Sequence, residues 1–579
     1  MRTAEAPRLA AGVQAWRRLA PALAGLAVAS VALAASAAPQ ICYTVRPQPP
    51  ETGRPGRTKV EVSIAGLTAG RPVRVVMPSW TPGDYRLQNH WRGVTDFSAA
   101  MPDGAPLVVT RPERDLWEVT ARGPELRVRY TVPNQEAGLF SENAIVTDRY
   151  AFLSGPAVLM LVHDRQSEPV TLTVEAPQGW PPALCPLQER AGEAGCFTAP
   201  SYDALADAPI LVGRHDESTF LEAGIRVTVA TFGPGTPMDA GPLAARFRPA
   251  VASAVAMFRS APFKRYTLFV DGGNKGGGLE HADSARVAWS GAPNSMFTAL
   301  ACHEFLHAWN VKRLRPQGMV PYDYRTPLRC RSLWFAEGVT EYLARLVLYR
   351  SGQITQVEFL NWLADDIAQY ESTPAAANVS AEEAGRRVWE GGQSSGYAGL
   401  SYYMKGELIG FCLDAALRRT SRGARGIEDV VRRMLPLYSP PKPGYTPPEL
   451  RESVLALAGA DLGSDYGGLV AGVGRMPFDW AAEALGLRLE RTRSGLRLTV
   501  DPAASAEMRA RRDAWLWGGE AVAEPHPAET APSGKDQSRL PVNLGATWQS
   551  TSATGPTRPR RPRLRRAASA AGRSCLAPC

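Results

Sequence analysis

Alternation of apolar and polar residues dominates the first third of the chain. Runs in which every second residue is apolar occur at residues 59–64, 126–130 and 170–174, and turns containing Pro and Gly separate them. A period of two residues is typical of a strand that buries one of its faces. The pattern therefore predicts a β domain at the amino-terminal end, over residues 39–216.

The spacing of apolar residues changes after this region. A strand at residues 225–230 is followed by a helix at 244–259 and a second strand at 266–270, and longer helical segments continue toward residue 480. This change from period two to helical spacing indicates a second domain. We predict a multidomain α+β protein whose second domain, mainly α-helical, occupies residues 217–480.

The first residues have the composition of a secretory signal. Arg17 and Arg18 precede an apolar, Ala-rich run at 19–35, and small residues follow at cleavage spacing. The run is short for a membrane anchor, and we find no second stretch long enough to span a bilayer. We predict a signal peptide over residues 1–38 and a mature bacterial protein without a membrane span, located in the periplasm or secreted.

The charge of the chain is concentrated at its end. The formal net charge is +9, but residues 541–579 contribute seven Arg and no acidic residue, so the folded body is near neutral. No basic stripe with interleaved aromatics occurs there, and we expect no nucleic-acid partner. Residues 526–579, rich in Pro, Ser, Thr, Ala and Arg, are predicted to be disordered. Among eight Cys, Cys185 and Cys196 are the predicted disulfide pair.

A segment that should be helical contains the pattern H-E-x-x-H. Asn294 or Ser295 can cap its start, and on a helix His303 and His307 lie on one face, so both imidazoles can bind one metal ion. Glu304 can then accept a proton from the attacking water. An amphipathic helix with two hydrogen-bonded histidines is the alternative. Because the chain has only seven His, we favour a zinc peptidase site.

A catalytic zinc ion takes three protein ligands, so a third is needed. The metzincin pattern is excluded because Asn310 and Arg313 stand where it requires Gly and His. A glutamate on the following helical segment is the remaining option, and Glu337 is the predicted ligand. Glu341, one helical turn later, could be the ligand instead, could orient a ligand histidine, or could be a surface carboxylate.

Four segments carry a resemblance to a known family. Residues 303–316 read HEFLHAWNVKRLRP, residues 334–342 read WFAEGVTEY, residues 77–85 read MPSWTPGDY and residues 277–281 read GGLEH. Together they resemble the glycyl aminopeptidase family of zinc metallopeptidases, over most of residues 41–480. The resemblance implies a thermolysin-like catalytic domain of the gluzincin type, Zn²⁺ as cofactor, and peptides with a free amino terminus as substrates.

The resemblance also implies roles for further residues. Glu280 would bind the terminal ammonium group of the substrate, Gly277 and Gly278 would lie along its backbone, and His281 would assist binding or make a structural hydrogen bond. Tyr403, or Tyr402 in its place, would stabilise the oxyanion. Core packing is the alternative for both tyrosines.

Beyond residue 480 the family pattern becomes incomplete. Members usually carry a PDZ domain, whereas residues 481–525 predict only a degenerate or truncated PDZ-like region. The predicted function is removal of small amino-terminal residues, Gly or Ala, from peptides. The alternatives are a zinc endopeptidase, which would not need Glu280, and a zinc-stabilised binding or scaffold protein of weak activity, which would not need Glu304.

Overall fold

The computed structural model describes residues 40–135, 143–235, 238–273, 276–390, 396–459, 462–493 and 495–518. The predicted signal peptide and the predicted disordered tail lie outside these residues. The chain forms two compact units: unit 1 extends to Cys330 and includes Glu428–Ser453, and unit 2 contains Arg331–Ile427 and the chain from Val454. Within the described residues, no helix is both long and apolar enough to cross a membrane.

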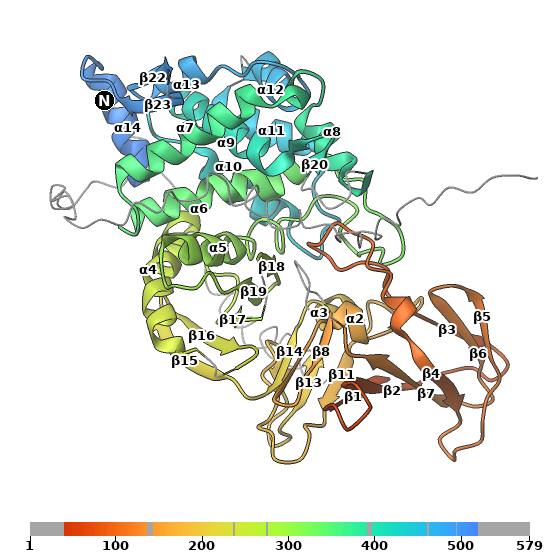
Figure 1. Ribbon diagram of the computed structural model, residues 1–579. Coiled ribbons are helices and arrows are strands. Elements are labelled where there is room, and N and C mark those ends of the chain that lie inside the picture. The colour runs from red at the N-terminus through yellow and green to blue at the C-terminus, as the bar shows by residue number, and fades with distance from the viewer. Residues whose placement is uncertain are drawn as a thin grey trace, which may run out of the picture. The chain divides into compact units, whose positions relative to one another are not determined.

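Unit 1 begins with a β domain of three sheets (Figure 1). The largest has the strand order β12 (Gln188–Glu189), β13 (Cys196–Ala199), β11 (Val170–Val174), β1 (Ile41–Gln48), β2 (Arg57–Ala65), β7 (Glu125–Pro133) and β4 (Thr95–Ala100). The second has the order β10 (Leu161–Val162), β3 (Pro72–Val76), β6 (Leu116–Thr120) and β5 (Val109–Glu113). The third joins β14 (Ile210–Gly213), β9 (Tyr150–Leu153) and β8 (Ala144–Val146).

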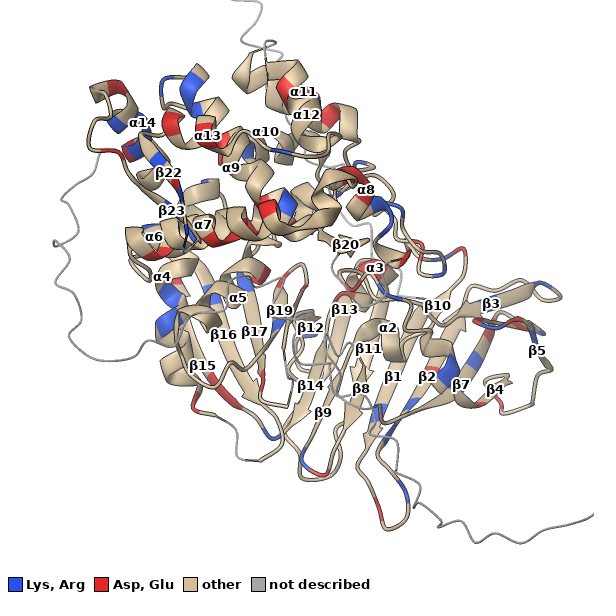
Figure 2. Cartoon of the chain, turned by 45° about the horizontal axis from the view of Figure 1, so that its top comes forward, with Lys and Arg blue, Asp and Glu red and all other residues tan. Residues whose placement is uncertain are grey.

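The alternating pattern in the sequence explains the largest sheet. In β2, Val60, Val62 and Ile64 are buried while the residues between them are partly or fully exposed. Short helical segments connect the strands: η1 (His90–Gly93), α2 (Gly155–Val158) and α3 (Tyr202–Ala206). Figure 2 shows acidic and basic residues interspersed along unit 1.

A five-stranded sheet follows in unit 1, with the order β15 (Asp216–Glu222), β16 (Ile225–Phe232), β17 (Arg265–Asp271), β19 (Ser284–Ala288) and β18 (Gly278–Glu280). The central strands β16, β17 and β19 are parallel, and β18 is an edge strand that pairs only with β19. α4 (Ala240–Phe258) packs against β15 and β16, α5 (Ser295–Leu306) packs against β18 and β19, and the two helices contact each other (Figure 1).

Aromatic side chains join the β domain to the five-stranded sheet. Phe152 of β9 stacks on Phe232 of β16, with ring centroids 4.9 Å apart, and meets Phe269 of β17 edge to face at 5.8 Å. All three side chains are buried in one cluster. Because aromatic side chains contribute large buried areas, this cluster fixes the β domain against the sheet that carries the site.

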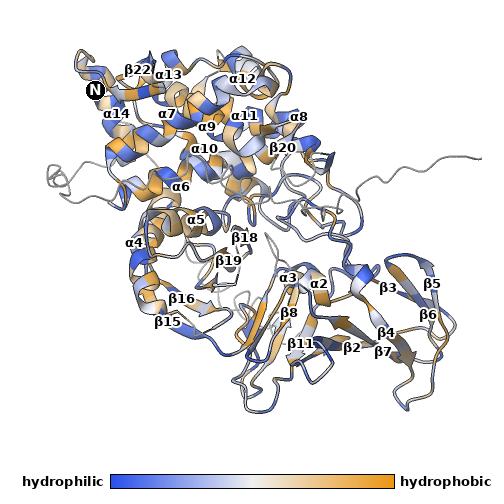
Figure 3. Cartoon of the chain, in the orientation of Figure 1, coloured by the Kyte–Doolittle hydropathy of each residue, from blue (hydrophilic) through white to orange (hydrophobic). Residues whose placement is uncertain are grey.

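Unit 2 is mainly helical. Its elements are η2 (Trp334–Gly338), α6 (Val339–Arg350), α7 (Gln356–Ser372), η3 (Pro374–Ala377), α8 (Ala381–Arg386), η4 (Val388–Glu390), β20 (Gly396–Tyr397), β21 (Leu400–Ser401), α9 (Tyr402–Thr420), α12 (Gly463–Val470), α13 (Phe478–Ala484), β22 (Leu487–Thr492), β23 (Gly495–Val500) and α14 (Ala506–Trp517). The segment that returns to unit 1 holds most of α10 (Ile427–Tyr438) and the first half of α11 (Pro447–Ala458). Hydrophobic residues are prominent along α6 and α9, which pack together (Figure 3).

The fold confirms a multidomain protein with an amino-terminal, mostly β domain and a helical carboxyl-terminal region. The domain boundaries, including the PDZ-like region at 481–525, stay predictions; that region holds the hairpin β22–β23 and α14. The predicted disulfide is wrong, because Cys185 and Cys196 are free thiols. The Cys196 sulfur instead accepts a hydrogen bond from Thr173, and burial raises the pKa of Cys185 to about 12.

Candidate active site

The helix α5 brings the two histidines of the H-E-x-x-H pattern together. The Asn294 side chain accepts a hydrogen bond from the Phe297 backbone N–H and caps the helix, as the sequence predicts. The helix ends at Leu306, and His307 follows as its carboxyl-terminal cap with helical backbone angles. His303 therefore stays one turn before His307, and their Nε2 atoms lie 3.0 Å apart.

These imidazoles fit a metal ion. A tetrahedral zinc ion with ligand nitrogens at about 2.0–2.1 Å holds two of them about 3.3 Å apart, close to the separation in the structure. The Nδ1 atom of His307 lies 2.7 Å from the carbonyl oxygen of Asn310. A carbonyl only accepts, so Nδ1 carries the proton and the Nε2 lone pair of His307 points toward His303. Both rings are buried.

The carboxylate of Glu304 lies against the edge strand β18. Glu304 is buried, and a Cβ added to Gly278 would lie 2.2 Å from its Oε1 atom. A separation below 3 Å is a clash, so only glycine lets the strand backbone come this close to Glu304. One carboxylate oxygen each of Glu280 and Glu304 and one ring nitrogen of His307 lie within 4.8 Å of one another.

Glu280, at the end of β18, is held from the side of the β domain. It is only 4% exposed. Gly83 has φ +98°, a conformation that favours glycine, and a Cβ there would lie 2.7 Å from both carboxylate oxygens of Glu280. The neighbouring residues of this loop pack on the same unit, since the Trp80 indole N–H donates to the Asp323 carbonyl over 2.8 Å. The loop at 77–85 therefore packs within unit 1 and also borders the carboxylate of Glu280.

A buried lysine links Glu280 to the β domain. Lys312 Nζ lies 2.8 Å from Asp207 Oδ1 and 3.7 Å from Glu280 Oε1. Asp207 also accepts a hydrogen bond from the Ala282 backbone N–H over 2.7 Å and lies 3.4 Å from Nδ1 of His281. Burial alone would raise the pKa of Asp207, but Lys312 and the His281 hydrogen bond hold that pKa well below its usual range.

Lys312 stays protonated because it lies beside the negative charge of Asp207. Burial alone would lower its pKa, but the charge of Asp207 raises it above the usual range, with Tyr322 and Glu280 adding to the effect. His281 makes a structural hydrogen bond through Nδ1, and among the described residues its Nε2 atom has no partner. His281 is 3% exposed, so this nitrogen is shielded from solvent.

The other predicted site residues belong to unit 2. Glu337 is buried in η2, a π-helical turn that precedes α6, and Glu341 is buried in α6, where it pairs with Arg345 at 3.3 Å. A surface role for Glu341 is therefore excluded. Tyr403 is half-buried in the first turn of α9, and its ring stacks on buried Tyr402 with centroids 4.8 Å apart.

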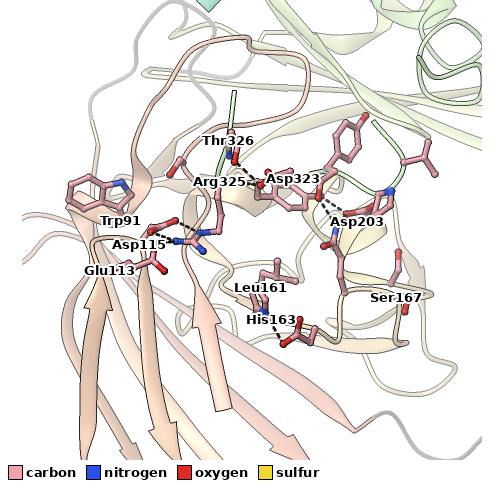
Figure 4. A pocket seen from close by; sticks show the side chains of 18 of the residues that line it. Trp91, Glu113, Asp115, Leu161, His163, Ser167, Asp203, Asp323, Arg325 and Thr326 are labelled. Atoms are coloured by element: carbon pink, nitrogen blue, oxygen red, sulfur yellow. Dashed lines mark hydrogen bonds and ion pairs between the residues drawn. The ribbon is translucent and has the colours of Figure 1, made fainter. Parts of the chain in front are cut away.

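A large cavity lies within unit 1. It has a volume of about 1190 Å³, and Figure 4 shows Arg325 directed toward Glu113 and Asp115 at its wall. Asp203 and Tyr324 also line it and share a hydrogen bond of 2.8 Å. None of the predicted site residues is among the described residues that line this cavity.

Sequence reasoning missed Asp207, Lys312 and Gly83. Lys312 stands in the segment 303–316 that begins with the H-E-x-x-H pattern, but its partner Asp207 is 105 residues earlier in the chain, so no local spacing connects them. Gly83 stands in the segment 77–85 and has a positive φ angle. In the sequence, only the glycine itself indicates such an angle there.

Comparisons with known proteins support this description. Residues 43–214 match the Peptidase M61 N-terminal domain, and residues 296–409 match the M61 glycyl aminopeptidase domain. The fold is similar to the crystal structure of an aminopeptidase N family protein from Idiomarina loihiensis, with a TM-score of 0.72 and 23% identity over 78% of this chain and 79% of that chain. No curated protein matches the sequence. The chain belongs to the M61 glycyl aminopeptidase family of peptidases.

Proposed function

We propose that this peptidase is a zinc-dependent aminopeptidase that removes Gly or Ala from the amino terminus of peptides. The observation that carries the proposal is the convergence, in one buried site, of the His303 and His307 Nε2 atoms with the carboxylates of Glu304 and Glu280. Two imidazoles suit a zinc ion, and the two carboxylates can serve as base and as amine receptor.

His303 and His307 would hold the metal ion, with Glu337 as the third ligand. Glu337 is buried in the segment WFAEGVTEY that resembles the family, on a helical segment, as a gluzincin-type and thermolysin-like catalytic domain requires. Glu341, tied to Arg345, would act as a neighbour of the ligands. A bound zinc ion would acidify water and polarise the carbonyl of the substrate.

Glu304 is the general base in this proposal. Its carboxylate accepts a proton from the attacking water, holds it on a carboxylate oxygen, and donates it to the departing amine nitrogen. Gly278 supports this role, because the strand backbone packs on the Glu304 carboxylate and limits its movement. A positioned general base contributes about 10²–10⁴-fold to a rate.

Glu280 would receive the ammonium group of the substrate. A charge-assisted hydrogen bond from the ammonium group to this buried carboxylate would make a free amino terminus a condition for binding. The edge strand β18, which contains Gly278 and begins after Gly277, can pair with an extended substrate backbone. The His281 Nε2 atom is a further polar group for the substrate.

Tyr403 is the proposed donor to the oxyanion, and Tyr402 is the alternative. Tyr403 is the more exposed of the two, so its hydroxyl is better placed to reach a substrate, whereas Tyr402 is buried. The preference for Gly or Ala rests on the resemblance to the family. The proposed location, in the periplasm or outside the cell, rests on the sequence at 1–38.

The decisive experiment compares free and blocked substrates. Glycyl- and alanyl-p-nitroanilide would be assayed beside their acetylated forms, with zinc content measured on the same preparation and Glu304→Gln as control. We expect cleavage of the free-amine substrates only, about one zinc per chain, and a loss of about 10²-fold or more in Glu304→Gln. Cleavage of the acetylated forms would favour an endopeptidase, and no cleavage despite bound zinc would favour a scaffold protein.

A further inference from the structure

Within unit 2, a closed ring of buried hydrogen bonds joins α14 to α6 and α9. The Trp515 indole N–H donates to the Tyr342 hydroxyl over 2.6 Å, and that hydroxyl donates to Asp414 Oδ2 over 2.8 Å. Arg418 donates from Nε to Asp414 Oδ1 and from Nη1 to the carbonyl of Ala514, both over 2.9 Å, which returns the ring to α14. The four residues whose side chains form the ring are at most 1% exposed. Such a buried ring, when complete, holds the three helices in one arrangement.

The carboxyl-terminal end of α14 is held in the same place. Arg350, the last residue of α6, donates to the carbonyls of Trp515 and Leu516 over 2.9 and 3.0 Å, beside the contact that Arg418 makes. The last carbonyls of a helix lack intrahelical partners and carry partial negative charge, so cations suit this end. The Trp515 ring also packs on Phe359 of α7, with centroids 5.4 Å apart. The end of α14 is therefore a fixed part of unit 2.

Tyr342, which the ring holds, lies on the same continuous helical segment as Glu337. The π-helical turn η2 leads directly into α6, and Gly338 and Val339 at the junction both have helical backbone angles. Tyr342 thus follows Glu337 by about one and a half turns. A Cβ on Gly410 of α9 would lie 3.4 Å from the Tyr342 ring, so this ring packs closely on that helix. Because packed interiors transmit small shifts, a helix fixed at Tyr342 also has a fixed position at Glu337.

We propose that α14 positions Glu337 through Trp515 and Tyr342, so that residues 505–517 belong to the metal-binding part of the protein rather than to a separate PDZ-like region. This inference rests on the proposed function, in which Glu337 is the third zinc ligand. Trp515 and Tyr342 are positioning residues, because they act on the metal site only through the helix. Loss of the ring lets α6 shift against α9, and the Glu337 carboxylate shifts with it and binds zinc less well.

The alternative is that α14 only stabilises unit 2. In that case, loss of the Tyr342 hydroxyl lowers the thermal midpoint but leaves the zinc affinity of the folded protein unchanged. Tyr43 of the β domain offers a matched control, because its buried hydroxyl donates to the carbonyl of Met160 over 2.7 Å. Tyr43→Phe removes one buried hydrogen bond from unit 1 and leaves α6 as it is.

The test uses Tyr342→Phe, Trp515→Phe, Glu337→Gln and Tyr43→Phe in the full-length protein. The Kd for Zn²⁺ would be measured by competition with a chromophoric chelator, well below the thermal midpoint of each variant, and the visible spectrum of the Co²⁺-loaded protein would report the ligand geometry. We expect Tyr342→Phe and Trp515→Phe to weaken zinc binding by about tenfold and to change the Co²⁺ spectrum. Glu337→Gln should weaken zinc binding further, and Tyr43→Phe should lower the thermal midpoint only.

The outcomes separate the inference from the proposed function. A wild type that binds no zinc, or a Glu337→Gln variant that binds it as tightly as the wild type, would overturn the ligand assignment and the inference with it. Zinc binding that is weakened in Glu337→Gln but unchanged in Tyr342→Phe, or weakened equally in Tyr43→Phe, would overturn the inference alone. If Trp515→Phe does not fold, Tyr342→Phe decides, because it keeps the aromatic ring and removes only the hydroxyl group.

Discussion

Gly278 determines how closely the edge strand β18 approaches the Glu304 carboxylate. A Cβ at this position would meet the Oε1, Cδ and Cγ atoms of Glu304 at 2.2–2.5 Å. The side chain of Glu304 would have to move by about an ångström, and a misplacement of that size can cost about 10²-fold in rate. The close approach of β18 to the Glu304 carboxylate therefore requires glycine at position 278.

We therefore expect Gly278→Ala to lower kcat on glycyl-p-nitroanilide by about 10²-fold while zinc content and the thermal midpoint stay near wild type. Gly468→Ala in α12 is the matched control, because a Cβ there meets nothing within 4 Å. A Gly278→Ala variant with unchanged kcat would contradict the placement of Glu304 against β18.

Lys405, two residues after the proposed oxyanion donor Tyr403, predicts a pH dependence of stability. Burial lowers its pKa from 10.5 to about 8, although its ammonium group donates to the carbonyls of Val379 and Gly472. Between pH 8 and 10.5 the unfolded chain binds more protons than the folded one, so this residue makes stability rise with pH. Below pH 8 its contribution is constant.

Urea unfolding at pH 7.5, 9 and 10.5 would check this. The free energy of unfolding of the wild type, minus that of Lys405→Met, should increase across the series. Using the difference removes the other groups that titrate in this range. A difference that stays constant or falls with pH would show that burial does not lower the pKa of Lys405 in the folded protein.

At this scale, local spacing made part of the site predictable. His303, Glu304 and His307 follow from one helical turn, because their chemistry and their separation are both contained in five residues. Asp207 could not be found in this way, since its role exists only once the fold brings it to Lys312. A buried lysine within a catalytic segment is nonetheless a signal that a distant carboxylate is required.

Two glycines determine how η2 crosses α9 in unit 2. A Cβ on Gly406 would lie 2.2 Å from the Trp334 carbonyl oxygen, and one on Gly338 would lie 2.5 Å from Cα of Gly406. The backbones are thus in direct contact at the turn that contains Glu337. This crossing explains why glycine stands at position 406, three residues after Tyr403.

Gly406→Ala should therefore destabilise the protein by about 1–3 kcal/mol, the usual cost of forcing extra volume into a packed interior. Gly467→Ala in α12 has open space and should be neutral or slightly stabilising. Denaturant midpoints would compare the two, and equal midpoints would contradict the close crossing. If Glu337 is a zinc ligand, zinc affinity should also fall in Gly406→Ala only.

Most elements follow from the periodicity of the sequence. The strands predicted at 59–64 and 225–230 are β2 and β16, and the helix predicted at 244–259 is α4. The π-helical turn of η2 was not predicted, because the spacing of apolar residues does not distinguish a single π turn from an α turn. Tertiary packing likewise decides the buried network in which Arg345 contacts Glu341, Asp366 and Glu407.

For the whole protein, the proposed metal ion links activity to stability. Ligand binding to the folded state alone stabilises it by about 2.7 kcal/mol when the free ligand is about a hundred times its Kd. Removing zinc with a chelator should abolish hydrolysis and lower the thermal midpoint, and added Zn²⁺ should restore both. Glu304→Gln should show the same thermal response without activity, because Glu304 is not a proposed ligand.

A chelated protein whose thermal midpoint does not change would contradict the metal site, and so would a midpoint restored equally well by Mg²⁺.

The order of a β domain before a helical region was predictable from the change in hydrophobic period. The joining of the β domain to the site was not, because it depends on contacts between residues that lie more than a hundred positions apart.

The ion pair between Asp207 and Lys312 has a consequence for how such enzymes can be recombined. The matches to the two M61 domains end at residue 214 and begin again at residue 296, and a chimera joined between them would look harmless in an alignment. In such a chimera the buried cation and its counter-ion would come from different parents. Exchange of either half between relatives should succeed only when the acid at position 207 and the base at position 312 still match, so these two positions constrain which parents can be combined.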